Sequence, residues 1–294
     1  MPVSVLLPFD GSPAAQRAVE LLAGHAGDAR SFEVLLLNVQ TRPVSLWPDA
    51  SAFTGAIEVA LLEEGRRTLE PARLRLEAAK LAVRAEVRLG LPAQAIVREA
   101  KANEAQVIVM GTRGAGPMRG YAFGSVALRV AHGGAAPVLL VKPQDRLPAA
   151  FGRRVRALVA MDGSEPALRA ARRLLDWRSW LGELEVQLVH VQRPLTTLQA
   201  VVPPHDDLLR QWSTEEAEQA TQAARELFRR AGVPHHLHLT AGDPALEVRE
   251  LAEQTSSEIV VLGTRGLGAA HHALVGSVAL KAAAAAAVPV LLVP

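Results

Sequence analysis

The sequence predicts an α/β protein made of two tandem domains, each an open parallel five-stranded sheet with helices on both faces. Three observations support this prediction. The 294-residue chain repeats a set of short motifs at a constant spacing of 152 residues. Each half alternates short apolar runs with longer helical patterns, which is typical of βαβ units. Most of the apolar runs are nearly continuous, as expected for strands that are buried on both faces of a sheet.

The repeated motifs define the domain organisation. Asp10-Gly11-Ser12 recurs as Asp162-Gly163-Ser164, and Gly111-Thr112-Arg113-Gly114 recurs as Gly263-Thr264-Arg265-Gly266. A repeat of this length indicates a duplicated domain and not a solenoid unit. We therefore expect one domain at residues 1–145 and a second at 153–294, with a linker that includes Pro143, Pro148 and Gly152.

Five strands are expected in each half. In the first half they cover Val3–Phe9, Phe32–Val39, Val83–Leu89, Val107–Met110 and Pro137–Val141. In the second they cover Val155–Met161, Glu185–Val191, His235–Leu239, Ile259–Leu262 and Pro289–Val293. Ser12 before Pro13 and Ser164 before Glu165-Pro166 predict helix starts, because a capping hydroxyl followed by proline favours the first turn. Pro8 lacks an N–H donor, so we expect it where the strand ladder is already opening.

Composition excludes several classes of function. Lys and Arg total 32 against 30 Asp and Glu, and this net charge of +2 does not indicate the basic face of a nucleic-acid-binding protein. The absence of cysteine excludes disulfides, thiol catalysis and Cys-based zinc sites. The N-terminus does not resemble a signal peptide, and the most apolar stretch, Ala282–Val293, is too short to span a bilayer. We expect a soluble cytoplasmic protein without nucleic-acid or membrane partners.

Polar and glycine residues cluster where predicted strands end. Asp10, Val39, Gly111 and Gly114 all lie at or just past such an end, as do their copies Asp162, Val191, Gly263 and Gly266. In open α/β sheets, ligands bind at the carboxyl ends of the strands, where the strand order reverses. We therefore place the first and fourth strands of each half side by side, with a ligand crevice between them.

The loop after the fourth strand has the form Gly-x2-Gly-x9-Gly-Ser. It runs from Gly111 to Ser125 and repeats without a gap from Gly263 to Ser277. Glycine allows backbone N–H groups to approach a phosphate, and the helix that opens at the Gly-Ser pair favours an anion. The pattern predicts a phosphate cradle without a Walker lysine, because neither a P-loop nor Gly-x-Gly-x2-Gly is present. The alternative is ordinary glycine turns, which two copies of identical spacing disfavour.

Together, the Asp after the first strand, the Val of the second and the glycine loop resemble the universal stress protein family, in its ATP-binding branch. The resemblance covers both halves. It implies a Rossmann-like fold, similar to the adenine nucleotide alpha hydrolases, with strand order 3-2-1-4-5. It also implies ATP as the ligand: the Asp lies beside the ribose and metal, the backbone around the Val meets adenine, and the glycine loop and Ser hold the phosphates. These residues are Asp10, Val39, Gly111, Gly114, Gly124 and Ser125, with Asp162, Val191, Gly263, Gly266, Gly276 and Ser277 in the second half.

Two features of this site leave alternatives open. Asp10 and Asp162, which would meet Mg²⁺ only through the nucleotide, could instead simply shape the turn after the first strand. Arg113 and Arg265 are further binding candidates, although a solvated loop arginine is the commoner outcome. Inside the loop Arg119 aligns with His271. An arginine pairs with phosphate at any pH, whereas a histidine does so only when protonated, so we expect the second site to bind ATP more weakly or with stronger pH dependence.

Three functions fit this reading. The first is a stress-response regulator or sensor with two nucleotide sites. The second is a slow Mg-dependent ATPase or phosphotransferase, for which the sequence offers no clear general base or arginine clamp, so no catalytic residue is assigned. The third is a non-catalytic scaffold.

In the resembling family the last strand makes the dimer contact, so we expect Pro137–Val141 and Pro289–Val293 to pair within the chain as a pseudo-dimer, with a homodimer as a further step.

Overall fold

The computed structural model describes residues 2–25, 32–42, 54–114, 123–149, 152–192, 206–266 and 275–294, with the backbone alone at 54 and 206–214. The chain divides into two compact units, Met1–Asp145 and Arg146–Pro294. In the part of the chain that is described, no helix has the length and apolar character needed to cross a membrane. The pairing expected between the two last strands stays a prediction.

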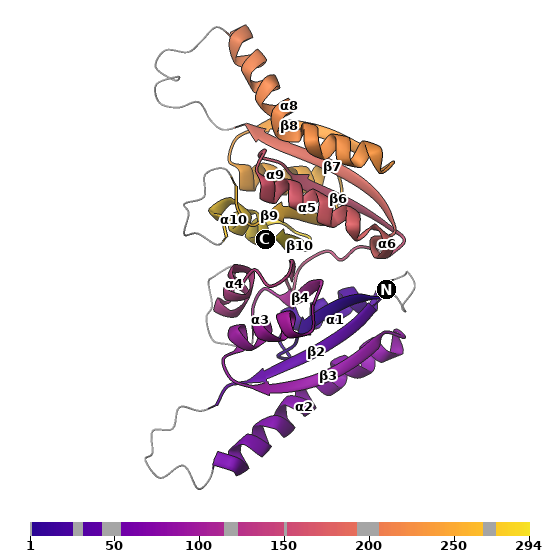
Figure 1. The fold of residues 1–294 in the computed structure, drawn as a ribbon, viewed down its shortest axis with the longest axis vertical. Coiled ribbons are helices and arrows are strands. Elements are labelled where there is room, and N and C mark those ends of the chain that lie inside the picture. The colour runs from indigo at the N-terminus through magenta and orange to yellow at the C-terminus, as the bar shows by residue number, and fades with distance from the viewer. Residues whose placement is uncertain are drawn as a thin grey trace. The chain divides into compact units, whose positions relative to one another are not determined.

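Unit 1 is a parallel five-stranded sheet between two pairs of helices. Its elements are β1 (Val3–Pro8), α1 (Pro13–Ala23), β2 (Phe32–Gln40), α2 (Thr54–Ala78), β3 (Ala82–Leu89), α3 (Pro92–Ala102), β4 (Val107–Gly111), α4 (Ser125–His132) and β5 (Val138–Val141). The strand order is β3-β2-β1-β4-β5, and the pairs are parallel. Helices α1 and α2 pack together, and α3 packs against α4, so each pair covers one face of the sheet (Figure 1).

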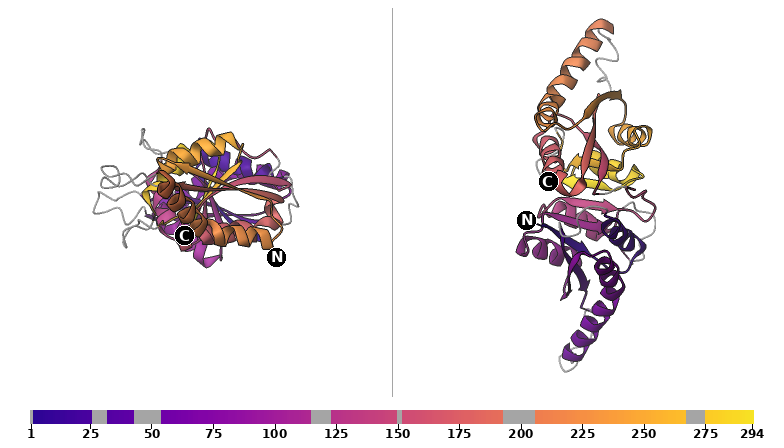
Figure 2. Two further views of the ribbon diagram at one scale, coloured as in Figure 1. Left: turned by 90° about the horizontal axis from the view of Figure 1, so that it is seen from above. Right: turned by 90° about the vertical axis from the view of Figure 1, so that its right-hand side faces the viewer.

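Unit 2 repeats this arrangement with one additional short helix. Its elements are β6 (Arg154–Ala160), α5 (Glu165–Asp176), α6 (Arg178–Leu181), β7 (Glu183–Gln192), α8 (Asp206–Arg230), β8 (His235–Ala241), α9 (Pro244–Gln254), β9 (Ile259–Gly263), α10 (Ser277–Ala285) and β10 (Val290–Val293). The order β8-β7-β6-β9-β10 is again parallel. Helices lie on both faces of this sheet as well (Figure 2).

The predicted fold class is confirmed, and the strand order in each unit is 3-2-1-4-5. Each predicted strand is present, with ends that differ by one or two residues. In one case the ladder continues into polar residues: Arg154 pairs with Glu183, and both are exposed, so neither carries an apolar signal. The short helix α6, which contains the buried Trp180, was not predicted.

Pro8 is accommodated at the end of β1, as the sequence predicts. The amide of Phe9 donates to the carbonyl of Leu37 on β2 at 2.8 Å, so the missing donor of Pro8 would face the other neighbour, β4. Pairing with β4 ends earlier, at Leu6 opposite Ile108. In unit 2, where Ala160 stands at this position, pairing continues one residue further, to Val159 opposite Val261, so the proline costs the ladder one hydrogen bond at its end.

Candidate functional site

Each unit has a cavity at the carboxyl ends of its central strands, of about 220 Å³ in unit 1 and about 240 Å³ in unit 2. The predicted site residues that the structure describes all line them. These are Asp10, Val39, Gly111, Arg113, Gly114, Gly124 and Ser125 in unit 1, and Asp162, Val191, Gly263, Arg265, Gly266, Gly276 and Ser277 in unit 2. Arg119 and His271 lie outside the described residues. The structure thus brings the described residues together, and their role in binding stays a prediction.

The Asp-Gly-Ser motif forms the turn from the first strand of each unit into the next helix. The Ser12 amide donates to Oδ1 of Asp10 at 3.0 Å, and Ser164 donates to Asp162 in the same way at 3.0 Å. The glycine between them has a φ of +79° in unit 1, in the left-handed region that favours glycine. The aspartate therefore does shape the turn, while its carboxylate also lines the cavity.

The serine of this motif was not predicted as a site residue beyond its role as a cap. Its hydroxyl accepts from the Ala15 amide at 3.3 Å, which caps α1, and donates to the Arg113 carbonyl at 3.1 Å. Ser164 makes the equivalent pair of contacts, with Ala167 at 3.3 Å and the Arg265 carbonyl at 3.4 Å. One hydroxyl thus fixes the glycine loop to the start of the first helix in each unit.

The first two glycines of the loop are required by the protein itself. A Cβ on Gly111 would lie 2.7 Å from backbone atoms of Ala14 and Ala15, so glycine permits α1 to pack closely against β4. A Cβ on Gly114 would lie 2.6 Å from Oδ2 of Asp10, because the carboxylate occupies the space of a side chain. Gly263 and Gly266 are placed in the same way in unit 2. Packing therefore explains these glycines without a phosphate, which the sequence pattern did not reveal.

The third glycine of the loop has no such requirement from the residues that the structure describes. Gly124 is the N-cap of α4 with φ −74° and ψ 153°, a conformation open to any residue, and a Cβ there would meet its nearest neighbour at 3.5 Å. Its amide donates to the Thr112 carbonyl at 2.8 Å, which closes the loop. Among the described residues, no side chain caps α4 or its counterpart α10, whereas Ser12 and Ser164 cap α1 and α5. The helix N-terminus therefore faces the cavity with amide groups suited to an anion.

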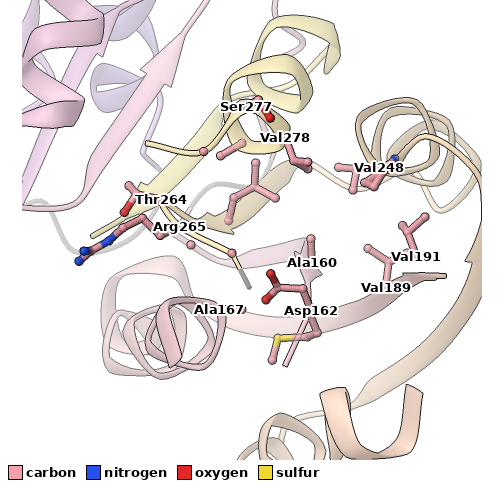
Figure 3. Close-up of a pocket in the computed structure, with 17 residues that line it drawn as sticks. Ala160, Asp162, Ala167, Val189, Val191, Val248, Thr264, Arg265, Ser277 and Val278 are labelled. Atoms are coloured by element: carbon pink, nitrogen blue, oxygen red, sulfur yellow. The ribbon is translucent and has the colours of Figure 1, made fainter. Parts of the chain in front are cut away.

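The cavity has an apolar end and a polar end. In unit 2, Val189, Val191 and Val248 lie together on one side, Thr264 and Arg265 lie on the other, and Asp162 lies between them (Figure 3). The apolar wall comes from β7 and α9. The equivalents in unit 1 are Leu37 and Val39 of β2 with Ile96 of α3. An apolar slot beside an anion-binding helix end fits the base and phosphates of a nucleotide.

Sequence reasoning missed the contribution of α3 and α9 to this wall. Pro92 and Ile96 line the cavity of unit 1, and Pro244 and Val248 line that of unit 2. A signal was available, because Gly90-x-Pro92 recurs as Gly242-x-Pro244 in the sequence. Both glycines have positive φ, which turns the chain from the edge strand into the helix that walls the cavity.

Charged groups are sparse at the polar end. Arg113 and Arg265 are exposed, and the guanidinium of Arg265 points away from the cavity in Figure 3. Over the described ranges, no group of three or more Asp, Glu or His side chains is arranged to hold a metal ion. A divalent cation would therefore need ligand oxygens in addition to Asp10 or Asp162, and Mg²⁺ at these residues stays a prediction.

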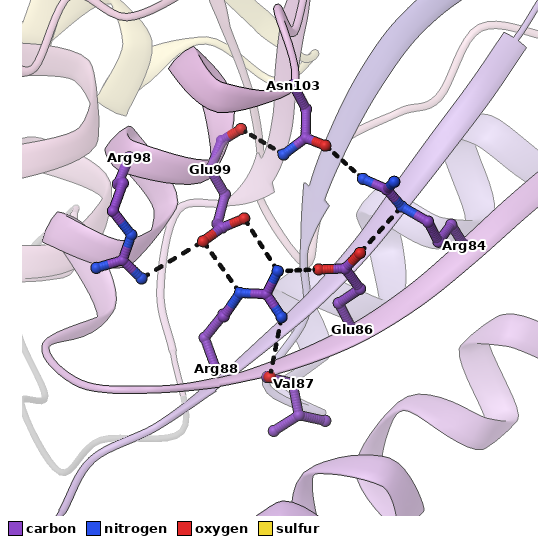
Figure 4. Close-up of polar contacts among 7 residues, drawn as sticks. All are labelled: Arg84, Glu86, Val87, Arg88, Arg98, Glu99 and Asn103. Atoms are coloured by element: carbon purple, nitrogen blue, oxygen red, sulfur yellow. Dashed lines mark hydrogen bonds and ion pairs between the residues drawn. The ribbon is translucent and has the colours of Figure 1, made fainter.

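In unit 1 an ionic network holds α3 beside the edge strand β3 (Figure 4). Arg88 contacts Glu86 on its own strand and Glu99 on α3, the latter at 3.0 Å, and Arg98 reaches the same Glu99 carboxylate at 3.4 Å. Asn103 joins the network through Arg84 and the Glu99 carbonyl. Burial raises the pKa of Glu99, but the hydrogen bond and charge of Arg88 outweigh it, so the pKa lies below its usual range. The carboxylate therefore fixes the helix that carries Ile96.

Comparisons with known proteins agree with this geometry. The model of the universal stress protein family matches residues 2–142 and again 154–294. A universal stress protein of Mycolicibacterium smegmatis is 27% identical over 98% of this chain and 96% of its own length. A shorter one from Thermus aquaticus is 34% identical over 46% of this chain and 96% of its own length. In the crystal structure of a universal stress protein from Archaeoglobus fulgidus, the fold matches 99% of this chain and 97% of that chain with a TM-score of 0.72 at 22% identity.

Proposed function

Because the chain belongs to the universal stress protein family, we propose that it binds one adenine nucleotide in each unit and acts as a nucleotide-dependent stress-response regulator in the cytoplasm. The observation that carries this proposal is the pair of helices α4 and α10. As far as the described residues go, each begins at a glycine that its neighbours do not require, and each opens without a side-chain cap onto a cavity with an apolar end. A phosphate at the helix N-terminus supplies the missing anion.

In this proposal the residues divide by the part of ATP that they meet. The backbone around Val39 and Val191 meets the adenine, and Asp10 and Asp162 lie beside the ribose and a nucleotide-bound Mg²⁺. The glycine loops and the hydroxyls of Ser125 and Ser277 hold the phosphates. Arg119 and His271 would modify the affinity of the two sites as the sequence predicts. The proposal also includes pairing of Pro137–Val141 with Pro289–Val293 within the chain, with a homodimer as a further step. Sedimentation of the full chain at several concentrations tests for the homodimer.

The test is a calorimetric titration of the nucleotide-free full chain with Mg-ATP. We expect two binding events per chain. The variants Gly124→Asp and Gly276→Asp place a carboxylate where the phosphate is proposed, so each should remove one event and the double variant both. Asp is at least as good as Gly at an N-cap, and a Cβ at either position meets only ordinary contacts, so the fold should be retained.

The controls separate loss of binding from loss of structure. Far-UV circular dichroism should give each Asp variant a melting temperature no lower than that of the parent chain. Failure of the parent chain to bind ATP, or full binding by the folded double variant, would refute the proposal.

A further inference from the structure

The two cavities are lined by residues at equivalent positions, 152 apart, but their apolar side chains differ in size. The positions that differ in size are Pro8 against Ala160, Phe9 against Met161, Leu37 against Val189, Ile96 against Val248 and Phe123 against Val275. All five exchanges remove non-hydrogen atoms in unit 2. At no described lining position does unit 2 gain any.

The cavity volumes differ little, at about 240 Å³ in unit 2 and about 220 Å³ in unit 1, with the larger cavity in unit 2. The change at Phe123 is the largest, because its ring lines the first cavity, whereas Val275 is 5% exposed and does not line the second. The neighbouring strands are tightly packed, with Leu188 and Val261 fully buried. A wall of this kind collapses only in part into the space that a missing methylene leaves.

Two of the exchanges enlarge the apolar end in particular. Val189 precedes Val191 by two residues on β7, so both face the same side of the sheet. Val248 faces them from α9, and the three side chains lie together in Figure 3. The additional space of unit 2 is therefore beside the backbone of Val191, where the base is proposed to lie.

This inference rests on the proposed nucleotide binding. We propose that the two cavities select different bases: unit 1 takes unsubstituted adenine, and unit 2 also admits an adenine that carries a small additional substituent. Leu37 and Ile96 are the residues that exclude the substituent, and Val189 and Val248 are the residues that admit it. A methylene in an apolar pocket changes discrimination by about 10- to 200-fold, so two exchanges are enough to separate the sites.

The experiment measures each cavity separately in the full chain. The Gly276→Asp variant leaves the cavity of unit 1 available, and Gly124→Asp leaves that of unit 2. Each variant is titrated with ATP, N6-methyl-ATP and 2-methylthio-ATP, and the readout is the ratio of the Kd of each analogue to that of ATP. At the unit 1 cavity we expect at least one ratio of about 10 or more, and at the unit 2 cavity we expect the same analogue within about threefold of ATP.

Exchange variants then assign the effect to the named side chains. Val189→Leu with Val248→Ile should raise the ratio of the analogue Kd to the ATP Kd in unit 2 towards the value of unit 1. Leu37→Val with Ile96→Val should lower this ratio in unit 1. Ile108→Val is the matched control, because Ile108 is fully buried in β4 and does not line the cavity. It should leave every ratio unchanged.

The outcomes distinguish base selection from ATP binding itself. Equal ratios in both cavities, with ATP still bound, would overturn the base selection and leave the proposed function intact. Unequal ratios that the exchange variants do not move would overturn the assignment to these residues. Absence of ATP binding in the parent chain would refute the proposed function itself.

Discussion

The two units place the same glycine, Asp and Ser residues around their cavities but differ at the outer corner, where the edge strand meets the helix that walls the cavity. In unit 1 this corner is ionic, through Arg88 and Glu99. At the equivalent positions unit 2 has Thr240 and Leu251, and Leu251 is buried. There the N-terminus of α9 is capped instead, since the Asp243 carboxylate accepts from the amides of Ala245 and Leu246 at 2.9 and 3.2 Å.

The difference shows which positions the fold constrains. At the cavity, Gly111 is fixed by backbone atoms of α1 and Gly114 by the Asp10 carboxylate, each within 3 Å of where a Cβ would lie, so few alternatives fit there. At the corner the requirement is only that a helix be held beside a strand, which an ion pair, an apolar contact or a cap can each satisfy. At Gly111 and Gly114 the similarity between the halves therefore marks geometric constraint, whereas the corner is free to vary.

The largest expected effect concerns the first loop glycine, which lines the cavity in both units. Gly111→Ala and Gly263→Ala should each destabilise their unit by about 1–3 kcal/mol or more, because the new methyl group meets helix backbone that cannot rotate away. Gly124→Ser is the control and should change the free energy of unfolding by less than about 0.5 kcal/mol, because Ser is at least as good as Gly at an N-cap and a Cβ there meets only ordinary contacts. Hydrogen exchange resolved to each unit measures this directly. A similar loss for Gly124→Ser would mean that the third glycine is also structural.

An intermediate effect is expected at the ionic corner. Glu99→Gln should destabilise α3 by about 1 kcal/mol at pH 7, since the pair with Arg88 is partly exposed. The pKa of Glu99 is lowered on folding, so its contribution is present above the unfolded pKa of about 4.3 and is lost as the pH falls through the folded value. Urea unfolding between pH 7 and pH 3 should therefore show a weaker pH dependence in the variant.

The control for this prediction is Glu63→Gln, whose partner Arg67 is 81% exposed, so no measurable change is expected. Unit 2 has Leu251 at the position of Glu99 and should lose no stability from this source. If α9 lost protection in acid in parallel with α3, the ion pair would not be the cause.

The smallest effect concerns the N-caps of the two wall helices. Leu91 is the N-cap of α3, makes no side-chain cap hydrogen bond and is 54% exposed, whereas Asp243 caps α9. Leu91→Asp should therefore stabilise unit 1 by about 0.5–1 kcal/mol, and Asp243→Leu should destabilise unit 2 by a similar amount. Thermal unfolding followed by circular dichroism checks both. Stability changes of equal size and opposite sign would show that an N-cap Asp contributes the same free energy in either unit.

The strands could be predicted from the sequence because burial on both faces makes them continuously apolar, as in Val107–Gly111 and Ile259–Gly263. The 152-residue repeat showed which polar residues follow the strands and which glycines form the loops. The reason for Gly111 could not be predicted, because it depends on the distance to α1 across the fold. The pair of Arg88 and Glu99 was equally hidden, since eleven positions and a change of element separate two residues of ordinary type.

The contact between Gly114 and Asp10 has a consequence for how such chains can drift. The carboxylate fills the space in which a side chain at 114 would begin, so the two positions change as one unit. A descendant that first lost the aspartate would find position 114 open to larger residues, and any such replacement would then block the aspartate from returning. Loss of this carboxylate should therefore be a one-way step, recorded in a lineage by the residue that replaces the glycine.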